Sequence, residues 1–208
     1  ASAGGAALGP SAGAVVADVT RAGEATHAVS DLLDAWDGLD GLVNNAGWGY
    51  VTPTLATDEA EWDLTLALNL TAPWRLSRQV APRLGPGGAI VNIASIYGVV
   101  AAPDRAGYCA SKAGLVMLTK VLALEWARAG IRVNAVAPGY VESAEVAALA
   151  DAGKIDLARI AGRTPMGRLA SADEVARAVC FLLDPAEAGH VTGQVLGVDG
   201  GWAAYGYV

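Results

Sequence analysis

The chain has 208 residues, is 53% hydrophobic and carries a formal net charge of −7 at pH 7. This length predicts one domain with one well-buried core. The acidic balance argues against nucleic-acid binding, which normally leaves a basic footprint. No uninterrupted run of 18 apolar residues is present, and no basic segment precedes an apolar stretch, so we expect neither a membrane partner nor a signal peptide.

The cysteines and histidines give no sign of a metal site or a disulfide. Cys109 and Cys180 are far apart in predicted helices, so we expect small core or interface residues in a reducing cytoplasm. His27 and His190 are isolated, without the spacing of metal ligands, and we interpret them as structural or solvated.

Residues 1–14 are Ala, Gly, Ser and Pro with a single Leu, a composition typical of a linker. Gly5 and Gly9 have the first spacing of a phosphate-binding glycine turn, but Ser11 occupies the third position and no strand precedes them. We therefore interpret these glycines as linker.

A short apolar run at residues 14–17 predicts a strand that ends at Asp18 and Val19. Two interpretations of Asp18 stay open. It can cap, or lie in the first turn of, a helix over residues 21–36. It can also contact a cofactor, because ligands of parallel sheets lie at the carboxyl ends of the strands.

The next apolar run, residues 39–43, predicts a strand closed by Asn44, Asn45, Ala46 and Gly47. Ala46 and Gly47 allow a ligand to approach the backbone closely. We expect Thr57 to cap the following helix.

Proline interrupts that helix. Pro73 has no N–H to donate to the carbonyl of Asn69, so either this carbonyl is free or the helix kinks there.

Residues 88–95 predict a buried strand that ends at Ser95, whose hydroxyl can donate to a substrate carbonyl. After a loop over residues 96–107, a helix is expected over residues 105–128, stopping at Gly130. Tyr108 and Lys112 lie one turn apart on one face of it. A nearby cation favours the phenolate, and lowering a tyrosine pKa by about 3 units requires about 4 kcal/mol.

The remaining elements are a strand over residues 131–136, closed by Pro138 and Gly139, and a helical insertion over residues 140–168 that we interpret as a substrate lid. Ser171 begins a capping box for a helix through residue 183. The last strand is expected over residues 194–198.

Together these motifs resemble the short-chain dehydrogenase/reductase family. They are the Asn44–Gly47 turn, Asn69, Ser95, the Tyr-x-x-x-Lys pair of Tyr108 and Lys112, and the turn at Pro138 and Gly139. The resemblance covers about residues 15–208. It implies an α/β fold of the Rossmann type, a doubly wound parallel sheet, and hydride transfer between NAD or NADP and a ketone or secondary alcohol.

The resemblance also implies roles for residues. The catalytic residues would be Asn69, Ser95, Tyr108 and Lys112, with the main chain of Asn69 holding a relay water. The cofactor would contact Asp18, Val19, Asn45, Ala46, Gly47, Tyr108, Lys112, Pro138, Gly139, Val141 and Ser143. Relatives usually have Thr where Ser143 stands.

The family's sheet order is 3-2-1-4-5-6-7, and this chain begins at its third strand. Strands 1 and 2, with the glycine turn, are missing from the sequence, so we expect a truncated version of a longer chain. The residue that chooses between NAD and NADP usually ends strand 2.

Relatives assemble as homodimers or homotetramers. The apolar arc of helix 105–128 and the tail aromatics Trp202, Tyr205 and Tyr207 are candidate interface residues, or ordinary surface aromatics in the case of the tail.

Two alternatives remain at this point. One is a non-catalytic or cofactor-free subunit that kept the fold. The other is an epimerase or dehydratase of the extended relatives, which the Asn44–Gly47 turn disfavours. The substrate classes of the family include 3-oxoacyl thioesters, sugars or polyols, and small ketones.

Overall fold

The computed structural model describes residues 13–35 and 38–206. Within them, four strands form one parallel sheet in the order β1-β2-β3-β4. The strands are β1 (Leu39–Asn44), β2 (Leu84–Ile93), β3 (Arg132–Pro138) and β4 (Val195–Val198). This order matches strands 4 to 7 of the predicted arrangement, and the predicted α/β fold with a parallel sheet is confirmed.

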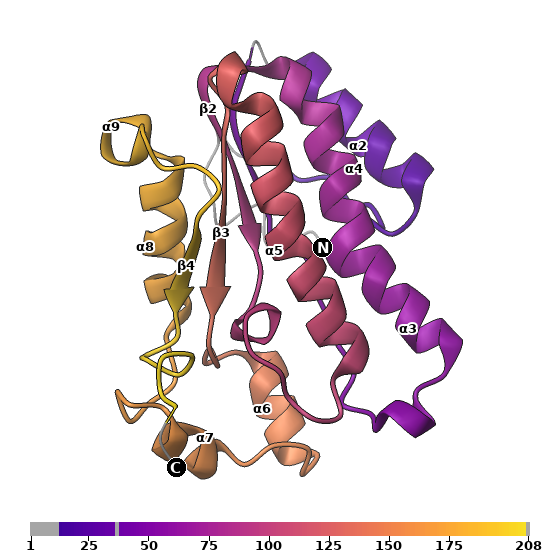
Figure 1. Cartoon of the computed structure of the whole chain (residues 1–208). Helices are drawn as coiled ribbons and strands as arrows, with labels where there is room; N and C mark the ends of the chain where they lie inside the picture. The colour runs from indigo at the N-terminus through magenta and orange to yellow at the C-terminus, as the bar shows by residue number, and fades with distance from the viewer. Residues whose placement is uncertain (1–12, 36–37, 207–208) are drawn as a thin grey trace.

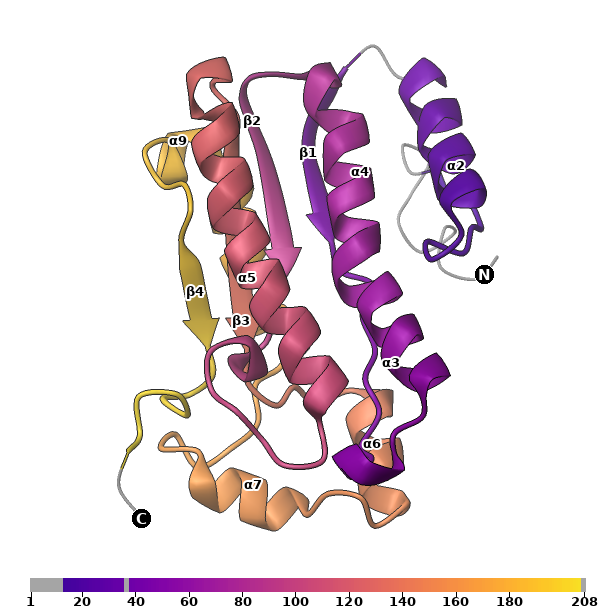
Figure 2. The same cartoon turned by 45° about the vertical axis from the view of Figure 1, so that its right-hand side comes forward.

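Helices cover both faces of the sheet. On one side lie α2 (Ala22–Ala35), α3 (Glu59–Leu66), α4 (Ala72–Val80) and α5 (Ala106–Trp126), and on the other α8 (Ala172–Leu183) and α9 (Pro185–Ala188) (Figures 1 and 2). The helices α6 (Ala144–Asp151) and α7 (Leu157–Arg163) lie beyond the arrowheads, at the carboxyl ends of the strands. Short 3₁₀ turns span Thr54–Ala56, Ala81–Arg83, Ile96–Gly98 and Ala127–Ala129.

The core lies on both faces of β2 and β3. Ile90 and Val133 pack with Leu122 of α5, whereas Val91 and Val136 pack with Leu182 of α8. A parallel sheet is buried on both faces, so its strands are nearly continuous apolar runs, as the sequence of β2 and β3 shows.

Buried amides connect the central strands to the helices. Asn44 Nδ2 donates to Asn92 Oδ1 at 2.8 Å, and Asn92 Nδ2 donates to the hydroxyl of Thr119 on α5 at 2.9 Å. These bonds satisfy polar groups that would otherwise be buried without partners. Asn44 therefore braces two strands, β1 and β2.

The predicted strand at residues 14–17 is wrong: these residues have no regular structure, and Val16 is 79% exposed. No described strand lies beside them, and a strand is stable only when a neighbour pairs with its backbone groups. The linker interpretation of Gly5, Gly9 and Ser11 lies outside the described residues.

Helix ends follow the expected chemistry with one correction. Asp58 caps α3, where Thr57 was predicted, because its carboxylate accepts from the Glu61 N–H. Ser171 and Glu174 form the predicted capping box of α8. Gly130 follows the last turn after α5 with a left-handed φ of 77°, which glycine adopts without strain.

A π-helical turn, Ala67–Thr71, joins α3 to α4. The N–H of Ala72 donates to the carbonyl of Ala67, five residues back, just before Pro73. The irregularity predicted from Pro73 is thus present, as a π-type turn; such turns are frequent at functional sites.

The two cysteines are unpaired: Cys109 in α5 is half-buried and Cys180 in α8 is exposed, so the core interpretation of Cys180 is wrong. Helix α5 with its 3₁₀ extension, Ala106–Ala129, is long and apolar enough by composition to cross a membrane. The core helix of a protein in water passes the same test, and α5 packs against the sheet and buries Lys112.

Candidate active site

A cavity of about 240 Å³ lies at the carboxyl ends of the strands. Turns after β1, β2 and β3, the start of α5 and the start of α6 all contribute to its wall. Nine residues of the predicted site line it: Asn45, Gly47, Ser95, Tyr108, Lys112, Pro138, Gly139, Val141 and Ser143.

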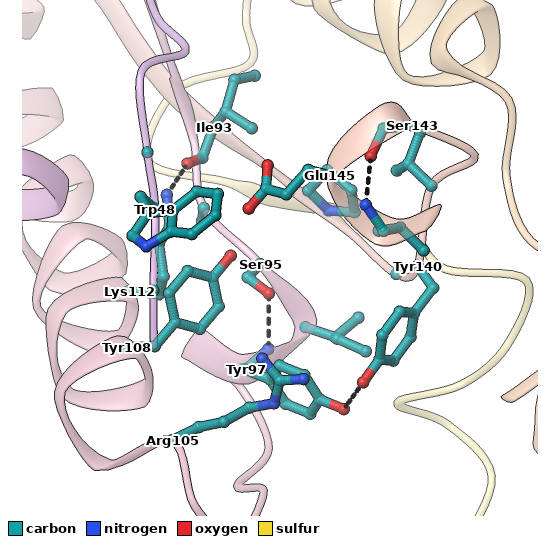
Figure 3. Close-up of a pocket in the computed structure, with 18 of the residues that line it drawn as sticks. Trp48, Ile93, Ser95, Tyr97, Arg105, Tyr108, Lys112, Tyr140, Ser143 and Glu145 are labelled. Carbon is teal, nitrogen blue, oxygen red and sulfur yellow. Dashed lines mark hydrogen bonds between the residues drawn. The ribbon is translucent and has the colours of Figure 1, made fainter. Parts of the chain in front are cut away.

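Ser95 and Tyr108 face each other across this cavity (Figure 3). Ser95 follows β2, and its oxygen accepts a bond from the Tyr97 N–H at 3.1 Å. The serine O–H can still donate, to the Tyr108 oxygen or to a substrate oxygen that enters between them.

Lys112 is 3% exposed and lies one turn after Tyr108. Its ammonium donates to the carbonyl of Ile93 at 2.8 Å and lies 5.7 Å from the centre of the Tyr108 ring. Burial lowers the pKa of Lys112 to about 8, and the carboxylate of Glu145 acts in the opposite direction.

Burial raises the pKa of Tyr108, contrary to the lowering expected from Lys112. Transfer out of water disfavours the charged phenolate, and this effect is larger than the hydrogen bond with Ser95, which favours it. The chain by itself thus keeps Tyr108 as a neutral acid.

Asn69 is fully buried beside the cavity, although it does not line it. Its amide accepts from the N–H of Trp48 at 3.0 Å, donates to the carbonyl of Trp48 at 2.7 Å and donates to Ser111 at 3.0 Å. The side chain therefore holds the turn after β1 against helix α5, which carries Tyr108 and Lys112.

The residues of this cavity fit a nicotinamide nucleotide. An ammonium has three N–H donors, and Lys112 uses one on Ile93, the single acceptor found for it among the described residues. A buried charge requires more partners than that, and ribose hydroxyls can supply them. Gly47 allows this packing, because a Cβ there would lie 2.9 Å from the ammonium.

Ser143 lines the cavity but also begins α6, where its hydroxyl accepts from the Val146 N–H at 3.2 Å. This cap leaves the hydroxyl proton free to bind a ligand.

Three residues of the predicted cofactor site do not line the cavity: Asp18, Val19 and Ala46. Asp18 forms a local turn before α2, in which its carboxylate accepts from the N–H and hydroxyl of Thr20. It borders a separate hollow beside Trp48 and Tyr50.

The residues of the wall that were not predicted include Trp48, Gly49, Tyr97, Arg105, Tyr140 and Glu145. Most could have been found from their positions, because Gly49, Tyr97 and Tyr140 come one or two residues after predicted strand-end positions, and Arg105 precedes Tyr108 by three.

Two aromatic residues of the C-terminal tail, Trp202 and Tyr205, pack against the guanidinium of Arg163 from α7. Tyr207 lies outside the described residues.

Gly49 is buried against the Tyr108 ring, and a Cβ there would lie 2.3 Å from its Cδ2 atom. We expect Gly49→Ala to push the ring aside and lower kcat/KM about 100-fold, the usual result of a displacement near 1 Å. Steady-state kinetics measures kcat/KM, and urea unfolding measures the stability of the variant. Gly23→Ala, where a Cβ meets nothing within 4 Å, is the matched control. Full activity in Gly49→Ala would contradict the assigned position of Tyr108.

Comparison with known proteins shows the family to which the chain is similar. A family model described as enoyl-(acyl carrier protein) reductase matches residues 3–203. An uncharacterized short-chain type dehydrogenase/reductase, y4vI of Sinorhizobium fredii, is 45% identical over 189 residues, or 89% of this chain. The chain spans about a third (34%) of that relative's length.

Two solved structures with bound cofactor are similar. ElxO with NADP bound has a TM-score of 0.83 at 29% identity, over 90% of this chain and 77% of that one. A 4-hydroxyisoleucine dehydrogenase complexed with NADH has a TM-score of 0.80 at 32% identity, over 92% and 81%.

The parallel sheet with helices on both faces and a cavity at the carboxyl ends of its strands define an α/β protein of the Rossmann type. The family model covers most of the chain, so it identifies one family within that fold class. The chain belongs to the short-chain dehydrogenase/reductase family.

Proposed function

We propose that the protein transfers a hydride between NAD(P) and a ketone or secondary alcohol, with Tyr108 as the general acid in reduction and the general base in oxidation. The observation that carries this proposal is the convergence of Ser95, Tyr108 and Lys112 on one cavity at the carboxyl end of the sheet. The nicotinamide supplies or accepts the hydride when the cofactor is bound.

The chain's own residues position the substrate and move the proton. Ser95 donates a hydrogen bond to the carbonyl oxygen, and the Tyr108 phenol gives that oxygen its proton as the hydride reaches the carbon. In oxidation the same proton returns from the alcohol to Tyr108. The neutral phenol that burial favours suits the reduction direction.

Lys112 has two proposed tasks. Its ammonium favours the phenolate of Tyr108, and its remaining N–H groups hold the ribose of the cofactor. The main chain of Asn69, at the π-type turn, holds a relay water that carries protons toward Lys112. Asn45, Gly47, Pro138, Gly139, Val141 and Ser143 complete the nicotinamide side of the cavity.

The segment 140–168 acts as the substrate lid. Helix α6 contributes Val146 and Leu149 to the cavity wall, opposite the catalytic helix α5. Their apolar side chains contact the carbon skeleton of the substrate and exclude water from the reacting atoms.

A panel of ketones and alcohols with NADH, NADPH and their oxidised forms, followed at 340 nm, tests the function and identifies the cofactor. Turnover of at least one ketone with one cofactor is expected. Failure to bind either cofactor, measured by fluorescence titration, would instead favour a cofactor-free subunit of the same fold.

A second copy of the chain is the proposed protein partner, in a homodimer or homotetramer. Met117, Val121 and Leu124 form an exposed apolar row on α5, and Trp74 of α4 is also exposed. We expect Leu124→Glu to shift the sedimenting species to a smaller mass, because it places a charge in this face. Leu55→Glu, at an exposed leucine before α3, is the control, and an unchanged mass for Leu124→Glu would exclude this face.

The unpaired thiols of Cys109 and Cys180 fit the reducing environment of the cytoplasm, where we place the protein.

A further inference from the structure

The cavity has charged groups of opposite sign on its two sides. Glu145 enters from the first turn of α6 and Arg105 from the residue that begins α5, with Ser95 and the Tyr108 hydroxyl between them (Figure 3). Both charges act on Tyr108: Glu145 raises the pKa of its phenol and Arg105 lowers it. An ionic substrate would therefore bind in one orientation.

Arg105 is a half-buried cation that pairs with no carboxylate in the part of the chain that the structure describes. Its Cζ atom lies 5.5 Å from the centre of the Tyr97 ring. Within residues 13–35 and 38–206, its guanidinium takes part in none of the ion pairs, which join other residues. Stacking on a ring uses the face of a guanidinium and leaves its N–H edge, a planar fork of donors, free for an acceptor.

Two phenols add donors beside this fork. The hydroxyls of Tyr97 and Tyr140 lie 3.0 Å apart, and their rings meet edge to face. In such a pair one hydroxyl donates to the other, which leaves the second O–H free to donate elsewhere. Burial raises the pKa of Tyr97, so its phenol keeps its proton.

None of these three residues is among the proposed nicotinamide contacts, so their polar groups stay free for a substrate. Arg105, Tyr97 and Tyr140 line the cavity beyond Ser95, and Val146 and Leu149 provide an apolar surface in the same cavity. A planar guanidinium fork matches the two oxygens of a carboxylate better than any neutral acceptor.

We propose that Arg105, assisted by Tyr97 and Tyr140, binds a carboxylate of the substrate, so that the substrate is an oxo acid or the corresponding hydroxy acid. The proposal rests on the function proposed above. The carbonyl lies at Ser95 and Tyr108, and the carboxylate points toward Arg105. Glu145 repels the carboxylate from the other end of the cavity and so fixes this orientation.

The test compares 2-, 3- and 4-oxo acids with their methyl esters, which keep the ketone and lose the charge. Wild type is expected to prefer one acid to its ester in kcat/KM. Arg105→Gln is expected to reduce that acid-to-ester ratio about 10- to 100-fold, chiefly through KM. Arg105→Lys keeps the charge without the fork and should retain part of the preference.

Arg128→Gln, which removes an exposed arginine just after α5, is the matched control and should keep the wild-type ratio. A wild-type preference for the esters, or an unchanged ratio in Arg105→Gln, would overturn the carboxylate subsite while leaving hydride transfer established.

Binding of pentanoate, which has no ketone, gives a readout that does not depend on turnover. Calorimetric titration with the full chain is expected to show binding to wild type that weakens about 10-fold or more in Arg105→Gln. This result would support the subsite even if no ketone is reduced. Absence of ketone reduction would refute the proposed reaction but not the carboxylate subsite. Equal pentanoate affinities for the two proteins would refute the subsite.

Discussion

Replacement of Tyr108 by phenylalanine is expected to lower turnover about 1,000-fold or more, while NAD(P) binding persists. The phenol is the group that gives the proton to the carbonyl oxygen, and a positioned acid or base of this kind contributes about 10²- to 10⁴-fold. Phenylalanine keeps the ring that packs against Gly49, so the fold and the cavity walls should remain.

The measurement is kcat with the best ketone from the panel, together with cofactor affinity from fluorescence titration. Tyr50→Phe removes the same hydroxyl from a half-buried tyrosine that does not line the cavity, and it should turn over normally. Turnover of Tyr108→Phe within tenfold of wild type would refute Tyr108 as the proton donor.

The sequence predicts the position of Tyr108 because its neighbours are set by short-range rules. Tyr108 and Lys112 share a face through helical periodicity alone. Ser95 is brought to them because a parallel sheet places all strand ends at one edge. These rules need only residue spacing and the order of the elements, and both can be predicted from the amino-acid sequence.

Other features depend on tertiary contacts that spacing does not encode. The run at residues 14–17 has strand-forming side chains, but a strand requires a partner, and no described strand lies beside it. The pKa of Tyr108 depends on how deeply the ring is buried, which the Tyr-x-x-x-Lys spacing does not reveal.

The convergence of Arg105, Tyr97 and Tyr140 is also tertiary in origin. Tyr140 follows β3, whereas Tyr97 and Arg105 belong to the segment between β2 and α5. Their contact depends on the path of loop 96–107. Gly98 and Pro103 predict that this segment is a loop, but they do not predict which of its side chains point into the cavity. Such loop residues decide substrate choice in a shared fold, and for this reason the family resemblance indicates a class of reaction but no substrate.

Replacement of Lys112 by methionine is expected to have two opposite effects. Turnover should fall about 10²- to 10³-fold, as after removal of a preorganised charge from other active sites. The free energy of unfolding near pH 7 should rise, because methionine removes the cost of burying a cation. Part of this gain is lost because the carbonyl of Ile93 no longer has its donor.

The pH dependence separates these contributions to stability. Lys112 has a pKa of about 8 in the folded chain, against 10.5 as the ordinary value. Between these two values the unfolded chain binds a proton that the folded chain has released, so the lysine's cost to stability is full below pH 8 and is removed as the pH rises to 10.5.

Urea unfolding at pH 7 and pH 10 should therefore show wild type gaining about 2 to 3 kcal/mol relative to Lys112→Met, at 1.36 kcal/mol per pKa unit. Tyr108 and Glu145 face Lys112 in both proteins and largely cancel in this difference. Lys120→Met, which removes an exposed lysine from the same helix, is the control and should show no such gain. A pH-independent difference for Lys112→Met would mean that the ammonium is not buried, and the proposed electrostatic coupling to Tyr108 would be lost with it.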